Sequence, residues 1–369
     1  MNTTNLLKDI VKIASISSHE RNLADYLFTH FLVAGLKPLK HEGNVYVRIP
    51  GADTTRALIF NAHMDTVSPG ALSLWKFPPY GKDSGIEIDG KIYGVGASDA
   101  KGSLASLLAL GDACAKTQPA LDVWIVFVCK EETGGDGTKS FLAWFTEKKW
   151  SLKYTEISAV VCGPTNMDEI HLGHRGNIHA EISVNGDGGH GAQPELIKKH
   201  AILEAMNIVE ELKKLEIELG KTYTDSVLGK PSIGITSIQA GDPVAPNKFP
   251  DTCSFTIDIR TTPSLHKSAF EIVEKLCTKF GAHIRVIYTP SPPGHTDPKT
   301  KIVACAKKLV TTIGLSKDST DLCFFSEMGI PGIILGPGDQ SASHKPNEYC
   351  DVSRCEKATE IYLKIIELI

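Results

Sequence analysis

The sequence predicts an α/β protein in which a mostly parallel sheet, covered by helices, is interrupted by a second and smaller domain. Helical periods alternate with short apolar runs up to about residue 172. A strict alternation of apolar and polar residues replaces that pattern in the middle of the chain, and the first pattern returns after about residue 292. Because buried parallel strands are apolar throughout whereas half-buried strands alternate, the change marks a different kind of sheet.

The two outer parts of the chain carry the signals of the first domain. Short apolar runs predict strands, and apolar residues that recur with helical spacing predict helices between them. The predicted strands are 44–49, 57–62, 123–129, 157–162 and 332–335, and the predicted helices are 23–32, 101–115, 301–313 and 356–368.

The middle of the chain predicts a different unit. Residues 178–184 and 252–259 alternate strictly, which is typical of half-buried strands. Strands are also predicted at 232–239 and 283–288, and helices at 195–219 and 267–280. The order β-α-β-β-α-β is that of a ferredoxin-like unit. We therefore predict a domain of residues 175–291 inserted into a discontinuous domain of residues 1–174 and 292–369; one continuous α/β domain is the alternative.

Composition narrows the class of partner. The chain has 369 residues, 42% of them hydrophobic, which is enough for two domains. A formal net charge of -4 with no long run of like charge argues against a nucleic-acid partner. No apolar run approaches the length of a membrane span, the N-terminus lacks the zones of a secretory signal, and the nine cysteines contain no CxxC pair. We expect a cytoplasmic protein with reduced thiols and a small-molecule substrate, without a membrane partner.

Potential metal ligands follow several of the predicted strands. His63 and Asp65 come directly after strand 57–62, and Glu131 and Glu132 follow strand 123–129. Asp99 stands between a Gly-rich segment and a helix start, and His344 follows the Gly-rich loop after the last strand. In an open α/β sheet, ligands gather at the carboxyl ends of the strands. The sequence therefore predicts one site at this edge.

The residue types indicate zinc. Two imidazoles and three carboxylates form the nitrogen and oxygen set that zinc prefers, although cobalt and manganese accept it as well. One of the paired acids can bind metal while its neighbour takes the proton of a metal-activated water. Asp65 is expected to accept the second imidazole N–H of His63 and so fix its tautomer. Singly, these residues are also explained as a surface pair, a helix cap at Asp99 and solvated acids.

With these residues, the chain resembles the co-catalytic zinc amidohydrolases and peptidases that include acetylornithine deacetylase, succinyl-diaminopimelate desuccinylase and the glutamate carboxypeptidases. The resemblance covers essentially the whole chain. It rests on His-Met-Asp-Thr at 63–66, Gly-x-Gly at 94–96 with Asp-x-Lys-Gly at 99–102, Glu-Glu-Thr-Gly-Gly at 131–135, Gly-His-Gly-Ala-Gln-Pro at 189–194, Asn-Lys-Phe-Pro-Asp at 247–251 and His-Lys-Pro-Asn-Glu at 344–348.

The resemblance assigns roles to matching positions. It implies His63 on one metal, Glu132 and His344 on the other, Asp99 between them, and Glu131 as general base and then acid. It also implies that the insert is a lid and dimerisation domain, which predicts a homodimer. His190 on the lid would reach the tetrahedral oxyanion, and Arg260, with Asn247 beside it, would clamp a substrate carboxylate. From the sequence alone, a loop histidine is the favoured interpretation of His190, and an exposed salt-bridge partner that of Arg260.

One position departs from the family pattern. The family usually has Gly-Glu-Pro-Thr after the strand at 157–161, with its Glu on the metal of His63, whereas this chain has Cys162-Gly163-Pro164-Thr165. Glycine has no side chain to donate, so we expect one tightly held ion and a second one that is weak or absent. Cys162 as a thiolate ligand is the alternative.

The resemblance favours hydrolysis of the amide bond of an N-acyl amino acid, as in acetylornithine deacetylase. A glutamate-carboxypeptidase-like or dipeptidase activity is the alternative within the class. A catalytically weakened binding protein, favoured by Gly163, is the alternative of another class.

Overall fold

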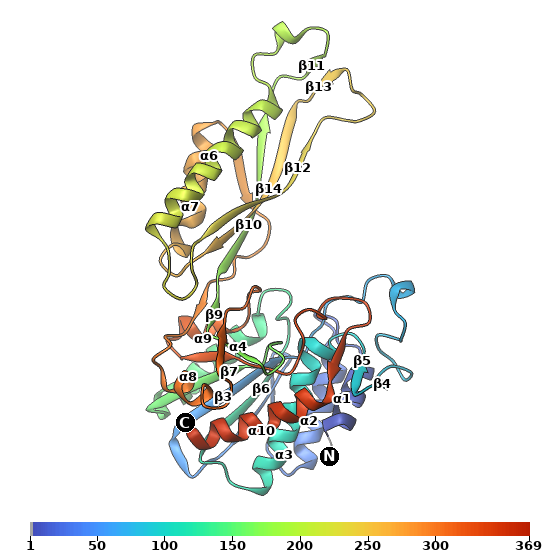
Figure 1. Cartoon of the computed structure of the whole chain (residues 1–369), viewed down its shortest axis with the longest axis vertical. Helices are drawn as coiled ribbons and strands as arrows, with labels where there is room; N and C mark the ends of the chain where they lie inside the picture. The colour runs from blue at the N-terminus through green and yellow to red at the C-terminus, as the bar shows by residue number, and fades with distance from the viewer. Residues whose placement is uncertain (1–2) are drawn as a thin grey trace. The chain divides into compact units, whose positions relative to one another are not determined.

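The computed structural model describes residues 3–369, which form two compact units (Figure 1). The first unit contains the described residues up to Gly173, together with Gly294–Ser316 and Thr320–Ile369. The second unit contains His174–Pro293 and Lys317–Ser319. The predicted insert of residues 175–291 lies inside the second unit, whereas the short Lys317–Ser319 segment was not predicted to belong with it.

An eight-stranded sheet forms the centre of the first unit. Its order is β1-β2-β6-β3-β7-β18-β8-β17, and the central strands β6, β3, β7 and β18 are parallel. The bounds are β1 Leu39–His41, β2 Asn44–Ile49, β6 Leu121–Val128, β3 Asp53–His63, β7 Glu156–Val161, β18 Gly332–Ile334, β8 Glu169–His171 and β17 Thr312–Gly314. Strand β6 is buried along its whole length, as expected for a parallel strand covered on both faces. The predicted α/β class is confirmed.

Helices cover both faces of this sheet. Helix α3 packs on β3, β2 and β6, and α1, α2 and α10 pack against α3. On the opposite face, Phe141 and Phe145 of α4 and Phe325 of α9 join a core with Trp124 of β6. The helices are α1 Thr3–Lys12, α2 Arg21–Val33, α3 Gly102–Lys116, α4 Asp136–Glu147, α5 Trp150–Lys153, α8 Lys301–Ala306, α9 Leu322–Glu327 and α10 Val352–Leu368. Small pieces complete the unit: β4 Ile86–Ile88, β5 Lys91–Tyr93, β19 Tyr349–Asp351, β9 Gly173–His174, β16 Gly294–His295 and the turns η1 Leu72–Leu74 and η2 Ala97–Lys101.

The second unit has the predicted β-α-β-β-α-β order. Its antiparallel sheet has the order β12-β14-β10-β15, which is that of a ferredoxin-like unit. The elements are β10 Gly176–Asn185, α6 Ala201–Thr222, β12 Ser232–Ala240, β14 Thr252–Thr261, α7 His266–Lys279 and β15 His283–Val286. The inward residues of β10 and β14 pack against both helices in one buried core. Beyond this sheet, β11 (Gly189–His190) pairs with β13 (Lys248–Phe249), near the turn η3 (Pro194–Leu196).

Two predicted helices were too long. The helix predicted at 301–313 ends as α8 at Ala306, because Thr312–Gly314 instead pairs with β8 as a parallel strand. The helix predicted from residue 195 begins at Ala201, because the Asp187 carboxylate accepts the backbone N–H groups of Lys198 and Lys199 and holds that stretch as a loop. Both errors come from contacts between segments distant in sequence.

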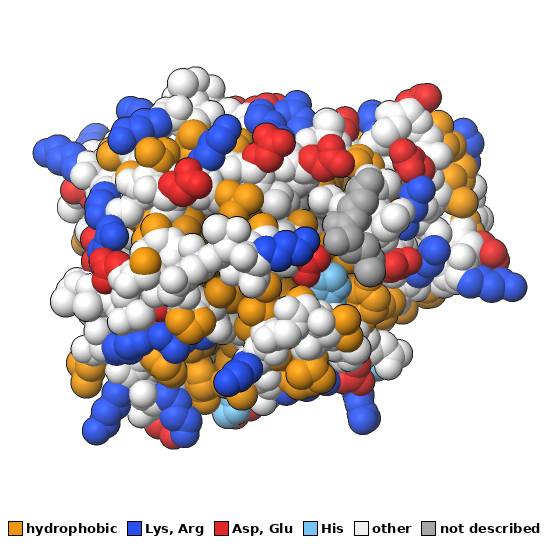
Figure 2. Space-filling model, turned by 90° about the horizontal axis from the view of Figure 1, so that it is seen from below, with side chains coloured by type: hydrophobic (Ala, Val, Ile, Leu, Met, Phe, Trp, Pro, Cys, Tyr) orange, Lys and Arg blue, Asp and Glu red, His pale blue; other side chains and the backbone are white. Residues whose placement is uncertain are grey.

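Acidic, basic and apolar side chains are mixed on the face shown in Figure 2, where neither sign of charge forms a continuous patch. All nine cysteines are free and buried. Among residues 3–369, none of the helices is both long and apolar enough to cross a bilayer.

Candidate metal centre

The sheet register brings the two main ligand segments together. Strands β3 and β6 are parallel neighbours, and His63 at the end of β3 pairs with Val128 at the end of β6. The chain then turns tightly through Lys130, which has a φ of 56°, and presents Glu131 and Glu132 beside His63. Residues that lie far apart in the sequence thus meet because parallel strands end at the same edge.

The His63 ring is oriented for binding through one nitrogen. Its Nδ1 donates to the backbone carbonyl oxygen of Asp65 at 2.9 Å, and its Nε2 lies 2.9 Å from Oδ1 of Asp99. The residue is 8% exposed, so few solvent positions compete for the ring. Because Nδ1 carries the proton, Nε2 is the nitrogen available to an ion.

Asp65 accepts the second imidazole N–H of His63 as predicted, but through its backbone carbonyl and not through its carboxylate. Its Oδ1 lies 3.6 Å from Nδ1 of His63, and the backbone carbonyl of the same residue takes the imidazole proton instead. The carboxylate accepts the Ser17 hydroxyl at 2.7 Å and the backbone N–H groups of Glu131 and Glu132 at 3.0 and 3.1 Å. Asp65 therefore fixes the tautomer through its main chain and the Glu131-Glu132 turn through its side chain.

Asp99 lies between the two histidines. While its Oδ1 faces His63, its Oδ2 lies 3.6 Å from Nε2 of His344. The same His344 nitrogen is 2.9 Å from Oε1 of Glu132. One carboxylate with an oxygen toward each imidazole is the arrangement expected of a residue shared by two ions.

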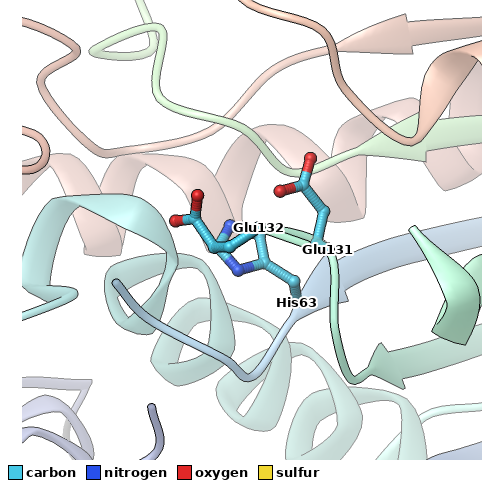
Figure 3. A group of neighbouring side chains, drawn as sticks. All are labelled: His63, Glu131 and Glu132. Atoms are coloured by element: carbon cyan, nitrogen blue, oxygen red, sulfur yellow. The ribbon is translucent and has the colours of Figure 1, made fainter. Parts of the chain in front are cut away.

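Two overlapping groups of ligand atoms result. His63, Glu131 and Glu132 form one, shown in Figure 3, and Asp99, Glu132 and His344 form the other; within each group the atoms lie within 4.8 Å of one another. The carboxylates of Glu131 and Glu132 point in different directions in Figure 3. Because β6 ends at Val128, this divergence comes from the turn and not from the pleat of a continued strand.

Burial and opposite charges shift the pKa values of these groups. Burial opposes the ionisation of Asp99. The hydrogen bond from His63 and the positive charge of its imidazole outweigh this effect and hold the pKa of Asp99 below its usual value. The hydrogen bond to Glu132 raises the pKa of His344 to about 9. Burial and neighbouring acids raise the pKa of Glu131 well above its ordinary value. An ion would relieve the repulsion among these acids and displace protons from the imidazoles.

Several buried groups beside the centre were not predicted. Glu348 accepts the backbone N–H of Asp99, and burial raises its pKa to about 7. Lys101 lies two residues after Asp99, and burial lowers its pKa to about 7. Asp321 accepts the Thr138 hydroxyl at 2.7 Å, and burial raises its pKa to about 7. The sequence signals were that Lys101 belongs to the motif that carries Asp99 and that Glu348 ends the motif that carries His344.

Position 163 offers no side-chain ligand, because it is a glycine. Gly163 follows β7, and its backbone N–H donates to Val161. The neighbouring Cys162 does not compensate, so that alternative is corrected. Its thiol is 1% exposed, lies next to Tyr362, has a pKa raised to about 12 by burial, and belongs to neither ligand group.

The second unit holds the three other predicted residues. His190 is exposed, and its Nδ1 accepts the Ala192 N–H at 3.1 Å, which leaves the proton on Nε2. Asn247 lies beside it, since its carbonyl accepts the N–H of Gly191 at 2.6 Å. Arg260 is paired with Asp258 at 2.9 Å.

Asn247 does not lie with Arg260, contrary to the prediction. Arg260 pairs with Asn177 near the start of β10, whereas the β11–β13 ribbon follows the far end of that strand, where Asn185 pairs with Thr252. Eight residues of extended chain correspond to more than ~20 Å. His190 and Asn247 thus form one group at one end of this unit, and Arg260 lies at the other end.

Two imidazoles and three acids lie at the carboxyl edge of a parallel sheet, and the second unit of the chain has the βαββαβ order. This combination is that of a hydrolase of the metallopeptidase class. The chain belongs to the peptidase family M20/M25/M40, whose model matches residues 59–368. The resemblance to the acetylornithine deacetylase group is thereby confirmed.

Curated relatives match over nearly the whole chain. A probable carboxypeptidase of Emericella nidulans is 25% identical, covering 98% of this chain and 88% of that protein. The acetylornithine deacetylase of Buchnera aphidicola subsp. Schizaphis graminum is 27% identical, covering 98% of this chain and 96% of that protein.

Solved structures share the fold. The M20 family metallo-carboxypeptidase Sso-CP2 from Sulfolobus solfataricus has a TM-score of 0.78 at 20% identity, covering 100% of this chain and 99% of that chain. A dinuclear metal-binding peptidase of the M20 family from Bacillus subtilis has a TM-score of 0.71 at 16% identity, covering 100% and 98%.

Proposed function

We propose that this chain hydrolyses the amide bond of an N-acyl amino acid, using water activated at the centre formed by His63, Asp99, Glu132 and His344. The observation that carries the proposal is the position of Glu131. Its carboxylate lies within 4.8 Å of the ligand atoms of His63 and Glu132, on a turn held by Asp65. An acid that can act as a base therefore stands next to the place where a reacting water would bind.

The residues fit zinc, with Asp99 and Glu132 common to both histidine neighbourhoods. A metal ion bound there supplies Lewis-acid activation of the water and of the scissile carbonyl. Because Gly163 contributes no side chain, the His344 side, with Asp99, Glu132 and His344, is the tighter position. The His63 side keeps only His63 and the shared Asp99, with the acids of the turn nearby.

Glu131 takes a proton from the attacking water and returns it to the leaving amine. The residue is half-buried, and its backbone is held on both sides, since its N–H donates to Asp65 and its carbonyl accepts the Gly134 N–H at 3.0 Å. The base is therefore positioned before the substrate arrives, which reduces the reorganisation that proton transfer requires.

His190 donates from Nε2 to the oxyanion that develops on the carbonyl, and Arg260 binds a substrate carboxylate. Within one subunit these residues lie at opposite ends of the second unit, so we propose that His190 and Asn247 serve the site of a partner subunit in a homodimer. Edge strand β12 exposes Ile235 and Ile238 at 37% and 54%, and an unpaired edge with apolar side chains is suited to such pairing. Nine buried free thiols favour the cytoplasm.

Carboxypeptidase or dipeptidase activity is the second candidate. The names of several similar proteins favour it, among them the probable carboxypeptidase of Emericella nidulans and the dipeptidase Dug1p of Saccharomyces cerevisiae. Both activities need the same base and the same amide chemistry, so only the group bound beside the scissile bond differs. A catalytically weakened binding protein is the third candidate and rests on Gly163 alone.

A substrate screen tests these proposals. The purified chain, with zinc or cobalt content measured on the same sample, is assayed for amine release from N-acetyl amino acids, dipeptides and longer peptides. We expect N-acyl amino acids to be turned over fastest, and Glu131→Ala to abolish release. Faster cleavage of peptides would favour the second candidate. Wild-type release no faster than that of Glu131→Ala on every substrate would favour the binding protein.

A further inference from the structure

Glu348 ties two distant segments of the metal centre together. It lies four residues after His344 and is 1% exposed. Its Oε2 accepts the backbone N–H of Gly96 at 2.8 Å, and its Oε1 accepts those of Ser98 and Asp99 at 2.9 and 3.0 Å. A single carboxylate therefore accepts three N–H groups from the segment that carries Asp99.

Further bonds join the same two segments. The Gly94 N–H donates to the Glu348 carbonyl at 2.9 Å. The Ser98 hydroxyl donates to the Tyr349 carbonyl at 2.6 Å and accepts the Asp339 N–H at 3.0 Å. Because about 250 residues separate these partners, no local rule of chain geometry holds Asp99 and His344 at a fixed separation. These hydrogen bonds supply that constraint.

The carboxylate has a specific chemical reason to be there. Three backbone donors converge on it, and an ionised carboxylate is a pure acceptor that can satisfy all of them. A glutamine of the same shape would turn its NH₂ group toward at least one N–H, placing donor against donor. Lys101, fully buried in the same segment, donates to the Ile13 carbonyl at 2.8 Å and ties the segment to a third part of the chain.

We propose that Glu348 is a positioning residue that fixes the separation of Asp99 and His344 and thereby sets the metal affinity of the centre. The inference rests on the proposed metal-dependent function. Glu348 holds the backbone N–H of Asp99, and the two carboxylate oxygens of Asp99 face the two histidines. This role goes beyond filling a buried position.

The test is a metal titration of Glu348→Gln. Zinc and cobalt affinities of the metal-free full chain are measured by calorimetry, and the cobalt absorption spectrum reports the coordination geometry. We expect an affinity on the order of ten- to a hundredfold weaker than that of the wild type, with a changed cobalt spectrum. At saturating metal, we expect kcat to fall more than KM rises.

Asp351→Asn is the matched control. Asp351 belongs to the same segment and also accepts a backbone N–H, that of Ser353 at 2.9 Å, but its side chain caps α10, with both of its hydrogen bonds to Ser353. It should lower thermal stability and leave the metal affinity unchanged. If Glu348→Gln does not fold, Glu348→Asp, which withdraws the carboxylate by one methylene, and Ser98→Ala are titrated instead, with several-fold losses expected.

Wild-type affinity in every folded variant of Glu348 and Ser98 would overturn the inference and leave the proposed function standing. Failure of the wild type to bind zinc or cobalt would overturn the proposed metal centre itself. An equal loss in Asp351→Asn and Glu348→Gln would also overturn the inference, because the effect would then be one of general stability.

Discussion

The ligand segments of the first unit and the substrate-contact candidates of the second unit are built differently. His63 is 8% exposed, and its ring donates to the nearby Asp65 carbonyl, whereas Glu348 is 1% exposed and accepts backbone N–H groups of Gly96 and Ser98, about 250 residues earlier. His190 and Asn247 are exposed on and beside the β11–β13 ribbon, and the His190 ring accepts one local hydrogen bond, from the N–H of Ala192. His63 and the Asp99 segment are thus held in the free protein, and the exposed His344 is held by its contact with Glu132. The ring of the proposed oxyanion donor makes a single local hydrogen bond. Changes in the first region should alter metal binding, and changes in the second should alter turnover alone.

Substitution of Glu131 should give the largest effect. It tests whether Glu131 acts as the base while Glu132 binds the metal. Glu131→Gln removes the base but keeps the shape of the side chain, so kcat should fall on the order of 10³- to 10⁴-fold while metal content stays at the wild-type level. Steady-state kinetics and elemental analysis of one preparation measure both. Glu132→Gln is the control and should lose metal. A Glu131→Gln protein that keeps more than a tenth of the activity would remove Glu131 from the mechanism.

Substitution of His190 tests whether the second unit contributes to turnover and not to metal binding. His190→Ala should lower kcat by about 10²- to 10³-fold, because an oxyanion donor acts only as charge develops in the transition state. Its metal affinity and its unfolding temperature should match the wild type, since the ring is exposed. Lys248→Ala, on the paired strand, controls for disturbance of the ribbon. Mixed dimers of His190→Ala and Glu131→Gln chains should regain activity if the donor comes from the partner; no regain would contradict that arrangement.

Gly163→Glu sharpens the contrast between the two metal positions. A Cβ at this position would meet only Cγ2 of Ile334, at 3.0 Å, so a side chain requires a small shift there. The added carboxylate should raise the affinity of the second ion about ten- to a hundredfold, so that dialysed protein retains two ions per chain instead of one. Gly163→Gln has a similar size without the charge and should not do so. Two ions retained by the wild type would refute the expectation of one weak position.

The pH dependence of metal binding should be the smallest effect. Because the pKa of His344 is raised to about 9 in the metal-free protein, the imidazole is protonated at neutral pH and must lose that proton when it binds an ion. Metal affinity should therefore rise with pH below about 9, by up to about tenfold per unit for each proton displaced. Calorimetry between pH 6.5 and 8 in buffers of different ionisation enthalpy counts the protons released. A flat profile would show that His344 is already neutral.

The sequence by itself determined the fold class, the order of elements in the second unit and the residue types at the strand ends. Periodicity is a local property, and the rule that parallel strands end at one edge turns local order into a shared site. For that reason His63, Glu131 and Glu132 could be expected together before any coordinates, and Asp99 and His344 with them.

Only the tertiary structure decided how those residues are held. The Asp65 carboxylate serves the Glu131-Glu132 turn, Glu348 binds the Asp99 segment, the Cys162 thiol lies beside Tyr362, and Asn247 and Arg260 lie at opposite ends of one unit. The end of the helix predicted at 301–313 is instead strand β17, because it pairs with β8. Hydrogen bonds from a side chain to the backbone of a distant segment leave no periodic trace in the sequence, because they depend on where the chain returns and not on which residues are neighbours.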